Sequence, residues 1–540
     1  MSQSASHTAK QSALEAAEQD GNGPMPRQIP YIVGTEGCER FSFYGMRNIL
    51  TPFLISTLLM FMPEAERAGE AKHVFHTFVI GVYFFPLLGG WLADRFFGKY
   101  DTIFWLSLVY CAGHACLAIW DHNITGFYTG LFLIALGSGG IKPLISSFVG
   151  DQFDQTNKKK ARVVYDVFYW MINFGSFFAS LLMPIFLKNY GPSIAFGIPG
   201  ALMFIATIVF WLGRKKYVHV PPAPPDPHSF TRVARSALLA HKAGQSRPGL
   251  YMALLGVAGA VASLAMSFYS WGFVIAACTA LVLLLAFGSI GTAMQLERAR
   301  GLHPDAAVDG VRAVLRILIV FALVTPFYSL FDQKASTWII QANAMVAPTV
   351  SLFGSSFTFV PAQMQALNPL FVMLLIPFNN LVLYPAMRRI GIEPTVLRRM
   401  TTGIVFSALS WIVIGAVQVE MDGGTPMSMA WQILPYALLT FGEVLVSATG
   451  LEFAYSQSPP SMKGLIMAFW FLTTTIGSLW VLIVNQGVKN EAVIAHIASS
   501  GVSVAAFQMF FFAGFAFAAA GAFGWYATRY KMMDNYRADA

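Results

Sequence analysis

Ionisable side chains line one face of the first long apolar segment of this 540-residue chain. The stripe consists of Glu36, Glu39, Arg40, Tyr44 and Arg47. If the segment is an α-helix, which turns about 100° per residue, these side chains fall within a sector of roughly 140°. Charges at membrane depth are costly unless they are paired or hydrated, so the stripe must face a protein interior or a polar pathway and not lipid. An internal ion pair that only stabilises the structure is the alternative.

Counting residues along the helices places further charges at two depths. At about 1.5 Å per residue, Arg47 lies roughly 16 Å beyond Glu36. Lys142 lies well into a segment that enters the membrane from the opposite side, which brings it near the level of Glu36. His76 and Asp332 lie near the outer ends of their segments, where Arg47 could meet both. We therefore expect an inner and an outer cluster of charges, as two gates would require.

His76 shares a helix face with Tyr83, seven residues later. A lone histidine in a helix is more often a satisfied core residue than a functional one. Its match in depth to Asp332 and Arg47 favours function, because histidine titrates near physiological pH and a neighbouring carboxylate tunes it. The pattern indicates a proton acceptor that faces the outer side of the membrane.

Glu443 lies near the middle of another apolar segment, with Ser447 one turn later and no basic residue beside it in its own helix. A midplane carboxylate of this kind suits the ammonium group of a ligand. Arg47 and Lys142, in the other half of the chain, suit a carboxylate. The charge layout therefore predicts a zwitterionic solute between the two halves, unless Glu443 pairs with another helix for structure only.

The elements that must position these residues are membrane-spanning helices. The chain is 56% hydrophobic and 11% charged, with a mean hydropathy of +0.57, which is too apolar for a soluble protein. A span needs roughly 20 apolar residues, and in lipid its backbone must satisfy its own hydrogen bonds, which makes long apolar runs helical. Fourteen spans are predicted, near residues 30–60, 72–97, 101–120, 125–150, 162–188, 192–213, 250–268, 270–296, 312–341, 361–388, 394–420, 428–456, 461–487 and 505–528.

Loop composition predicts the orientation and the domain organisation. The basic loop residues lie mostly on one side of the membrane, which places both termini in the cytoplasm. The net charge of +8 comes from these short loops and forms no continuous basic face, so it does not indicate a nucleic-acid-binding protein. The two spans after the proline-rich linker carry almost no interior charge, so we expect a peripheral hairpin. The predicted parts are a disordered cytoplasmic tail (1–27), an N-terminal six-helix bundle (28–213), the linker with the hairpin (214–310), a C-terminal six-helix bundle (311–530) and a cytoplasmic tail (531–540).

Other classes of protein find little support. The four cysteines, all inside predicted spans, lack the spacing of a disulfide framework or a metal site: they are Cys38, Cys111, Cys116 and Cys278. No nucleophile with a base, metal triad or phosphate loop is visible, so we expect neither an enzyme nor a metal or cofactor. The first thirty residues lack the apolar core of a cleaved signal peptide, so the first span is expected to act as an uncleaved signal. An integral membrane protein in contact with lipid, without an obligate protein partner, is the remaining interpretation.

Short motifs occur in both halves of the chain. The first half contains Glu36-x-x-Glu39-Arg40-Phe41-x-Phe43-Tyr44-Gly45, Gly89-Gly90-Trp91-Leu92-Ala93-Asp94-Arg95, Gly139-Gly140-Ile141-Lys142-Pro143 and Phe168-Tyr169-x-x-Ile172-Asn173-x-Gly175. The second half contains Phe327-Tyr328-x-x-Phe331-Asp332-Gln333, Asn368-Pro369-Leu370 and Glu452-Phe453-Ala454-Tyr455-Ser456. In this order they resemble the signatures of the proton-dependent oligopeptide transporter (POT) family, a branch of the major facilitator superfamily, over about residues 30–530. A bacterial-type member is expected.

The resemblance implies an all-α major facilitator fold with the extra helical hairpin of bacterial members. It also implies proton-coupled symport of di- and tripeptides by alternating access across the plasma membrane, which is the inner membrane in bacteria. Proton coupling and gating would fall to Glu36, Glu39, Arg40, Lys142, His76, Asp332 and Arg316. Peptide contacts would fall to Tyr44, Arg47, Tyr83, Lys142, Asn173, Tyr328, Asn368, Glu443, Ser447 and Trp470.

Three positions depart from the family pattern. Phe43 stands where a tyrosine is usual, which would remove a hydroxyl from the binding stripe, and Tyr328 stands where several members have tryptophan. Arg316 would face Asn380 where relatives can offer an acid, so the inner gate would use another contact. One rival keeps the fold but carries a different small solute, such as nitrate, a drug or a peptide-like compound. Glu443 disfavours an anion as the cargo, because an anion carrier has little use for a midplane carboxylate that faces its site. The other is a receptor or channel, which paired charges at two levels disfavour.

Overall fold

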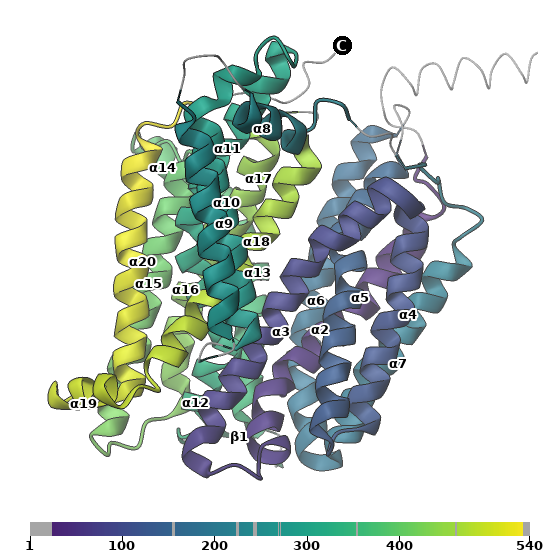
Figure 1. Ribbon diagram of the computed structural model, residues 1–540. Coiled ribbons are helices and arrows are strands. Elements are labelled where there is room, and N and C mark those ends of the chain that lie inside the picture. Colours follow the sequence, from purple (N-terminus) through teal and green to yellow (C-terminus); the bar gives the residue numbers. More distant parts are fainter. Residues whose placement is uncertain are drawn as a thin grey trace, which may run out of the picture. The chain divides into compact units, whose positions relative to one another are not determined.

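The structure is a computed structural model of the chain (Figure 1). It describes residues 24–153, 157–222, 226–240, 246–267, 269, 272–352, 355–459 and 462–532. The predicted tails, 1–27 and 531–540, lie almost entirely outside the described residues, and so do Pro224 and Pro225 of the predicted linker. The side chains of Lys158, Lys159, Arg162 and Lys463, four of the basic loop residues, also lie outside them.

The chain divides into two compact units, and two helices contribute to both. The first unit contains the chain up to Pro63, the chain from Phe84 to the proline-rich loop, and Ala362–Met373. The second unit contains Glu64–Tyr83, the chain from the proline-rich loop to Pro361, and the chain from Leu374 onward. Helix α3 (Glu64–Leu92) therefore changes unit after Tyr83, and α13 (Leu367–Phe378) changes unit after Met373. Where the predicted six-helix bundles begin and end stays a prediction, because these units do not follow whole helices.

Helices in the first unit pack closely through glycine. A Cβ on Gly113 of α4 would lie 2.8 Å from the Gly130 carbonyl oxygen of α5, and a Cβ on Gly130 would lie 2.9 Å from the Gly113 oxygen. Small residues of this kind let membrane helices approach backbone to backbone. Gly191, with φ 83°, separates α6 from α7. The helical elements are α2 (Ile29–Phe53), η1 (Leu54–Leu58), the end of α3, η2 (Ala93–Phe97), α4 (Gly98–Ile119), α5 (Ile124–Asp151), α6 (Lys158–Tyr190), α7 (Pro192–Leu212), η6 (Pro361–Ala366) and the start of α13.

The second unit holds the remaining helices and one small sheet. Strands β1 (Thr349–Leu352) and β2 (Ser355–Thr358) pair antiparallel with Thr349 opposite Thr358. The helical elements before the sheet are the start of α3, α8 (Phe230–Leu239), α9 (Pro248–Met266), α10 (Phe273–Gln295), η4 (Leu296–Ala299), α11 (Asp305–Phe331), η5 (Asp332–Ala335) and α12 (Thr337–Asn343). Those after it are the end of α13, η7 (Asn379–Leu383), α14 (Tyr384–Arg389), α15 (Val396–Asp422), η8 (Met429–Gln432), α16 (Ile433–Glu443), η9 (Val444–Ala448), α17 (Thr449–Gln457), α18 (Lys463–Gly487), α19 (Glu491–Ser499) and α20 (Val504–Ala527).

Twelve segments of the described chain are long and apolar enough to cross a membrane. One of them, Glu64–Ile119, contains both α3 and α4. Helix α2 is not among the twelve, and it is the helix that carries Glu36, Glu39, Arg40 and Arg47. Counting α2 and dividing the long segment makes the observed helices compatible with the fourteen predicted spans.

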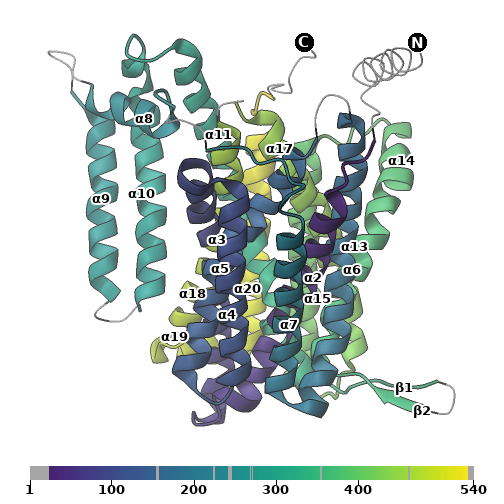
Figure 2. The same cartoon turned by 90° about the vertical axis from the view of Figure 1, so that its right-hand side faces the viewer.

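Helices α9 and α10 form a hairpin at the edge of the second unit (Figure 2). They meet at Gly249 and Gly291, where a Cβ on Gly291 would lie 3.2 Å from the Ala253 amide nitrogen. Ile275 of α10 packs against Leu479 and Leu482 of α18. Most of the hairpin surface stays exposed, because only 22% and 17% of its two apolar windows are buried.

The sequence did not predict helix α8, which lies inside the expected linker. Gln295 of α10 holds this helix, because its Nε2 donates to the carbonyl oxygens of Ala237 (3.0 Å) and Leu238 (2.8 Å) in the last turn. The last carbonyls of a helix have no partner within the helix, so this side chain satisfies groups that would otherwise be bare. Gln295 Oε1 also accepts from the Gly249 amide at 3.2 Å. One side chain therefore joins α8, α9 and α10.

Candidate functional site

The charged stripe of α2 forms a buried ion cluster within the first unit. Arg40 Nε lies 2.6 Å from Glu36 Oε1 and 2.9 Å from Glu39 Oε2. The three residues are 7%, 1% and 0% exposed, respectively. Lys142 on α5 is near enough to Glu36 to interact with it electrostatically. The structure thus brings together the four residues of the predicted inner cluster, and their formal charges sum to zero.

The cluster is not a fully satisfied structural ion pair. The second carboxylate oxygen of Glu36, Oε2, is buried and has no hydrogen-bond partner in the described part of the chain. A buried polar atom without a partner costs free energy, and a buried charge costs more. The phenol of Tyr110 on α4, itself fully buried, is a further neighbour of Glu39 that the sequence did not indicate. Because one oxygen of Glu36 has no hydrogen-bond partner in the described part of the chain, the cluster is better suited to accept a proton than to serve only as a stabilising ion pair.

Phe43 holds Lys142 in place. The Lys142 Nζ lies 3.5 Å from the centroid of the Phe43 ring, which is a cation–π geometry. Phe43 is 1% exposed, so its ring packs beneath the lysine and does not line an open surface. The expectation that Phe43 removes a hydroxyl from the binding stripe stays a prediction, whereas its contact with Lys142 was not expected. The sequence could not show this, because helical spacing alone does not reveal which neighbour covers a side chain.

Two glycines set the position of Lys142. A Cβ on Gly139 would lie 2.5 Å from the Phe85 carbonyl oxygen of α3, and a Cβ on Gly140 would lie 2.7 Å from the Leu106 Cβ of α4. Helix α5 therefore contacts both neighbours at van der Waals distance directly before the lysine. This close packing leaves α5 little freedom to shift along its axis, because protein interiors have low compressibility.

The other predicted residues of the first unit lie on α2, α6 and α13. Arg47 is buried on α2, two turns beyond Arg40, with Tyr44 between them. Asn173 of α6 is also buried, and its Nδ2 donates to the Tyr169 carbonyl oxygen at 3.0 Å. Asn368 joins this unit with the start of α13. The turn directly before α13, η6, is attached to α2 by a hydrogen bond of 3.0 Å from Gln365 Nε2 to the Asn48 carbonyl oxygen.

His76 lies in the second unit between two serines that the sequence did not indicate. Its Nε2 is 3.0 Å from Ser336 Oγ, and its Nδ1 is 3.5 Å from Ser478 Oγ. Asp332, four residues before Ser336, is 1% exposed. The position of Ser336 directly after the Asp332 motif was a usable signal, whereas nothing in the sequence pointed to Ser478.

Aromatic rings and one carboxylate make up the rest of this unit's candidate site. The rings of Tyr328 on α11 and Trp470 on α18 lie 6.0 Å apart at 77°, and Tyr83 stacks on Phe471 at 6.4 Å. Glu443, partly exposed, is the last residue of α16 before the π-helical turn η9. Ser447 lies in η9 and contacts the Tyr328 hydroxyl. Wide turns of this kind are frequent at functional sites.

Arg316 does not join the candidate site in the second unit. Its side chain is exposed near Tyr526 and Tyr530 of the last helix and the segment after it. No contact between Arg316 and Asn380 is found among the described residues, so that pairing stays a hypothesis. Arg47 and Lys142 belong to the first unit, and His76, Asp332 and Glu443 belong to the second. The outer gate requires Arg47 to meet His76 and Asp332, and the zwitterion site requires Glu443 to face Arg47 and Lys142. Both arrangements stay predictions.

The sequence also missed a second buried histidine, His114 of α4. Its Nε2 lies 3.0 Å from Ser42 Oγ, while Ser42 donates its single proton to the Pro199 carbonyl oxygen at 2.6 Å. The His114 Nε2 must therefore be the donor, which makes Nδ1 the free acceptor in the neutral ring. This Nδ1 is buried and finds no partner within the described residues. The pair ties α2 to α4 and α7 one helical turn from the ion cluster.

Comparison with known proteins decides the family. The chain matches the model of the POT family over residues 100–498. It belongs to this family. The crystal structure of an auto-inhibited POT family peptide transporter is 67% identical, with a TM-score of 0.91 over 95% of this chain and 99% of that chain. The POT family transporter PepTSo is 64% identical, with a TM-score of 0.91 over 95% of this chain and 100% of that chain.

Among curated relatives, solute carrier family 15 member 2 of Mus musculus is 31% identical over 441 residues. The match covers 79% of this chain and 54% of the mouse protein, so this POT member spans about half the length of the curated relatives it matches. The predicted family and the all-α polytopic fold of the major facilitator type are confirmed. The protein is an integral membrane protein.

Proposed function

We propose that this POT family protein is a proton-coupled symporter that imports di- and tripeptides by alternating access. Its setting would be the plasma membrane, the inner membrane of a bacterium, with both termini in the cytoplasm. Similar proteins named as peptide transporters support the cargo. The observation that carries the proposal is the electroneutral cluster of the buried Glu36, Glu39 and Arg40 with the partly buried Lys142, which can change its charge only by taking up or releasing a proton.

Charge balance suggests how this cluster couples protons to transport. With both carboxylates ionised, two anions balance two cations in a site closed to water. A proton on Glu36 or Glu39 leaves an excess positive charge, and a buried excess charge is costly. The excess charge is removed at the lowest cost in free energy if Lys142 leaves the cluster. Lys142 lies on another helix, whereas Arg40 lies on the same helix as both carboxylates and contacts each of them. A lysine freed in this way exchanges a protein carboxylate for that of a peptide, or the reverse.

The cargo follows from residues of opposite charge in the two units. Arg47 and Lys142 offer cations for a peptide carboxylate, and Glu443 offers an anion for its amino terminus. Tyr44, Asn173 and Asn368 would supply further polar contacts, and Tyr83, Tyr328, Ser447 and Trp470 would contact the side chains. His76 and Asp332 would act as the outer proton acceptors, and their protonation would disfavour the contact with Arg47 that an outer gate requires. Each of these assignments follows the family motifs.

Uptake of a labelled dipeptide into proteoliposomes tests the proposal, with an inward proton gradient imposed or absent. We expect gradient-driven accumulation in the native protein and its loss in Glu36→Gln, with peptide exchange across the membrane retained. Glu66→Gln, an exposed carboxylate at the start of α3, is the matched control and should behave as native. Uptake indifferent to the gradient would refute proton coupling, and full accumulation by Glu36→Gln would remove that residue from the proton path.

A competition panel tests the cargo separately. Unlabelled di- and tripeptides should compete with the labelled dipeptide, and nitrate should not. Glu443→Gln should weaken competition by peptides much more than competition by N-acetylated peptides, which have no ammonium group to lose. If nitrate competes as well as peptides, the same fold carries an anion and the peptide assignment is wrong.

A further inference from the structure

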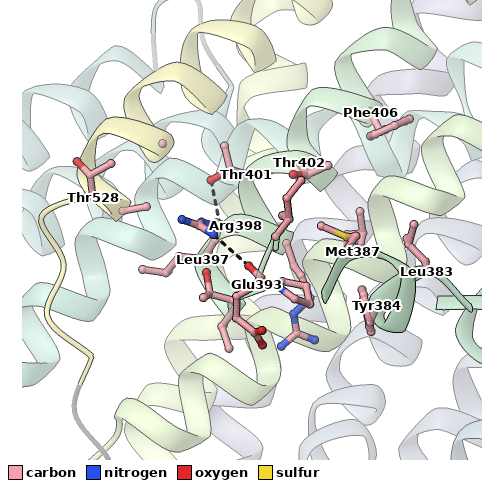
Figure 3. Close-up of a pocket in the computed structure, with 18 of the residues that line it drawn as sticks. Leu383, Tyr384, Met387, Glu393, Leu397, Arg398, Thr401, Thr402, Phe406 and Thr528 are labelled. Carbon is pink, nitrogen blue, oxygen red and sulfur yellow. Dashed lines mark hydrogen bonds between the residues drawn. The ribbon is translucent and has the colours of Figure 1, made fainter. Parts of the chain in front are cut away.

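A cavity of about 970 Å³ lies in the second unit, and none of the residues that line it belongs to the candidate site (Figure 3). It is bordered by α14, the start of α15, the α16–η9 junction and the end of α20. Its volume is near the upper end of the roughly 300–1,000 Å³ typical of small-molecule pockets. The cavity is therefore large enough for a ligand of its own.

The lining changes character from one side of the cavity to the other. Figure 3 shows Arg398 and Glu393 on one side, with Met387, Leu383 and Phe406 on the other. Phe441 and Leu445 extend the apolar side. A water-filled cavity with such a lining would be unfavourable, because apolar surface is driven out of contact with water. The expected occupant has an apolar body and a polar end.

The polar end of the cavity contains two arginines, Arg398 and Arg399, and one carboxylate, that of Glu393, so its net charge is positive. Helix α15 begins at Val396, and its first turn contains no acidic residue, although the N-terminus of a helix favours negative charge. Arg398 and Arg399 lie in this first turn, where acidic residues are usual. Arg399 Nη2 reaches Glu452 at 2.9 Å, while its buried Nε has no hydrogen-bond partner among the described residues. Two arginines at the positive end of a helix predict an anionic group between them.

Neighbouring groups hold Arg398 and Arg399 on either side of the expected anion position at the start of α15. Arg398 Nη1 donates to the Glu393 carbonyl oxygen at 3.2 Å, which fixes it over the turn before α15. The Arg399 guanidinium carbon lies 5.5 Å from the Tyr384 ring centroid, which directs it toward α14. Burial raises the pKa of the Tyr530 phenol, another lining residue, so this phenol stays a neutral hydrogen-bond donor. None of the three side chains would repel an anion.

The surface around the cavity mixes exposed apolar and basic residues. Leu381 and Ile390, before and after α14, are 76% and 72% exposed, and Arg388 and Arg389 lie between them. Apolar side chains next to arginines are typical of segments at the boundary between lipid acyl chains and headgroups. Basic pockets between membrane helices on the cytoplasmic side are known to bind anionic lipid headgroups.

We propose that this cavity is a binding site for an anionic phospholipid of the leaflet that the basic loops face. The phosphate lies between Arg398 and Arg399 at the start of α15, and an acyl chain lies against Met387, Phe406 and Phe441. A free anion would leave the apolar side filled with water. An uncharged lipid would leave Arg398 with only the Glu393 carbonyl oxygen as its hydrogen-bond partner among the described residues, while Arg399 keeps its contact with Glu452. The site lies within one unit and does not depend on the transport proposal.

Native mass spectrometry of the purified protein with added lipid tests the site. The probes are phosphatidylglycerol and phosphatidylcholine with the same acyl chains. We expect one phosphatidylglycerol to bind more tightly than phosphatidylcholine, and the double variant Arg398→Gln/Arg399→Gln to lose about 30-fold in affinity for it, the factor that corresponds to about 1 kcal/mol per arginine. Thr402→Trp, which fills the cavity from its lining, should weaken the binding of both lipids.

Arg389→Gln is the matched control, because Arg389 is exposed on the same end of the unit but does not line the cavity. It should bind phosphatidylglycerol as the native protein does, and glycerol phosphate should not displace the lipid. Equal binding of the two lipids, or native binding by the double variant, would overturn the proposal. Complete displacement by glycerol phosphate would also overturn it, since the site would then hold a soluble anion.

Discussion

Removing Arg40 should destabilise the protein through charge imbalance and not through lost packing. Arg40 contacts both Glu36 and Glu39 at less than 3 Å in a site almost closed to solvent. In Arg40→Gln, two buried carboxylates remain against Lys142 alone. Removing one partner of a buried ion pair typically costs about 3–5 kcal/mol, because the remaining charge stays in a poor solvent. We expect a loss of about this size for Arg40→Gln.

A double variant separates this explanation from ordinary packing effects. In Arg40→Gln/Glu36→Gln, one carboxylate and one lysine remain, so the cluster is neutral again. The double variant should therefore be more stable than Arg40→Gln alone, although it carries one more substitution. The interaction energy between the two changes should be about 2–3 kcal/mol, near the upper end for residues in contact.

Thermal unfolding in detergent, followed by the fluorescence of the 12 tryptophans, measures these differences. Arg232→Gln on α8 is the control, because Arg232 is exposed. The deficit of Arg40→Gln should also shrink at acid pH, where a proton on Glu36 restores neutrality. If Arg40→Gln unfolds at the native temperature, or if the double variant is no more stable than Arg40→Gln, the charge-balance argument fails.

Three further changes test the packing. Gly139→Ala should cost about 1–3 kcal/mol, because the new Cβ would lie 2.5 Å from a backbone oxygen of α3, whereas Gly90→Ala meets nothing within 4 Å and should be neutral in the same thermal unfolding measurement. Gln295→Ala should release α8, so limited proteolysis should cut near it faster than in the native protein, and unchanged cleavage would contradict the anchoring role. Trp480→Phe removes the 3.1 Å hydrogen bond to Thr325 and should cost about 1 kcal/mol, and a variant of native stability would show that this bond is dispensable.

The sequence carried enough information to predict the charged stripe of α2. Helical periodicity places Glu36, Glu39 and Arg40 on one face, and the cost of charge in lipid turns that face inward. The constant rise of a helix then brings Lys142 to the same depth, which the structure bears out within the first unit. Both arguments use quantities that do not depend on which helices are neighbours.

Features that depend on neighbours could not be predicted in this way. Hydropathy shows that a segment can cross a membrane, but it does not show that the two ends of α3 pack in different units. The serines beside His76 and the aromatic ring beneath Lys142 come from other helices, so no spacing within one helix reveals them. The pair of strands β1 and β2 was missed because each is only four residues long, too short for its alternation of apolar and polar residues to stand out.

The π-helical turn at Asn379–Leu383 has a consequence for the phase of the helix that follows it. A π turn holds one residue more than an α turn, so every later side chain is rotated by about 100° relative to an unbroken α-helix. Tyr384 and Met387, which line the cavity, follow this turn and share its offset. A POT family member that lacks one residue of this turn would turn a different face of α14 toward its neighbours, even if every other residue were the same. Alignments that treat such a deletion as silent would then compare residues whose side chains point about 100° apart.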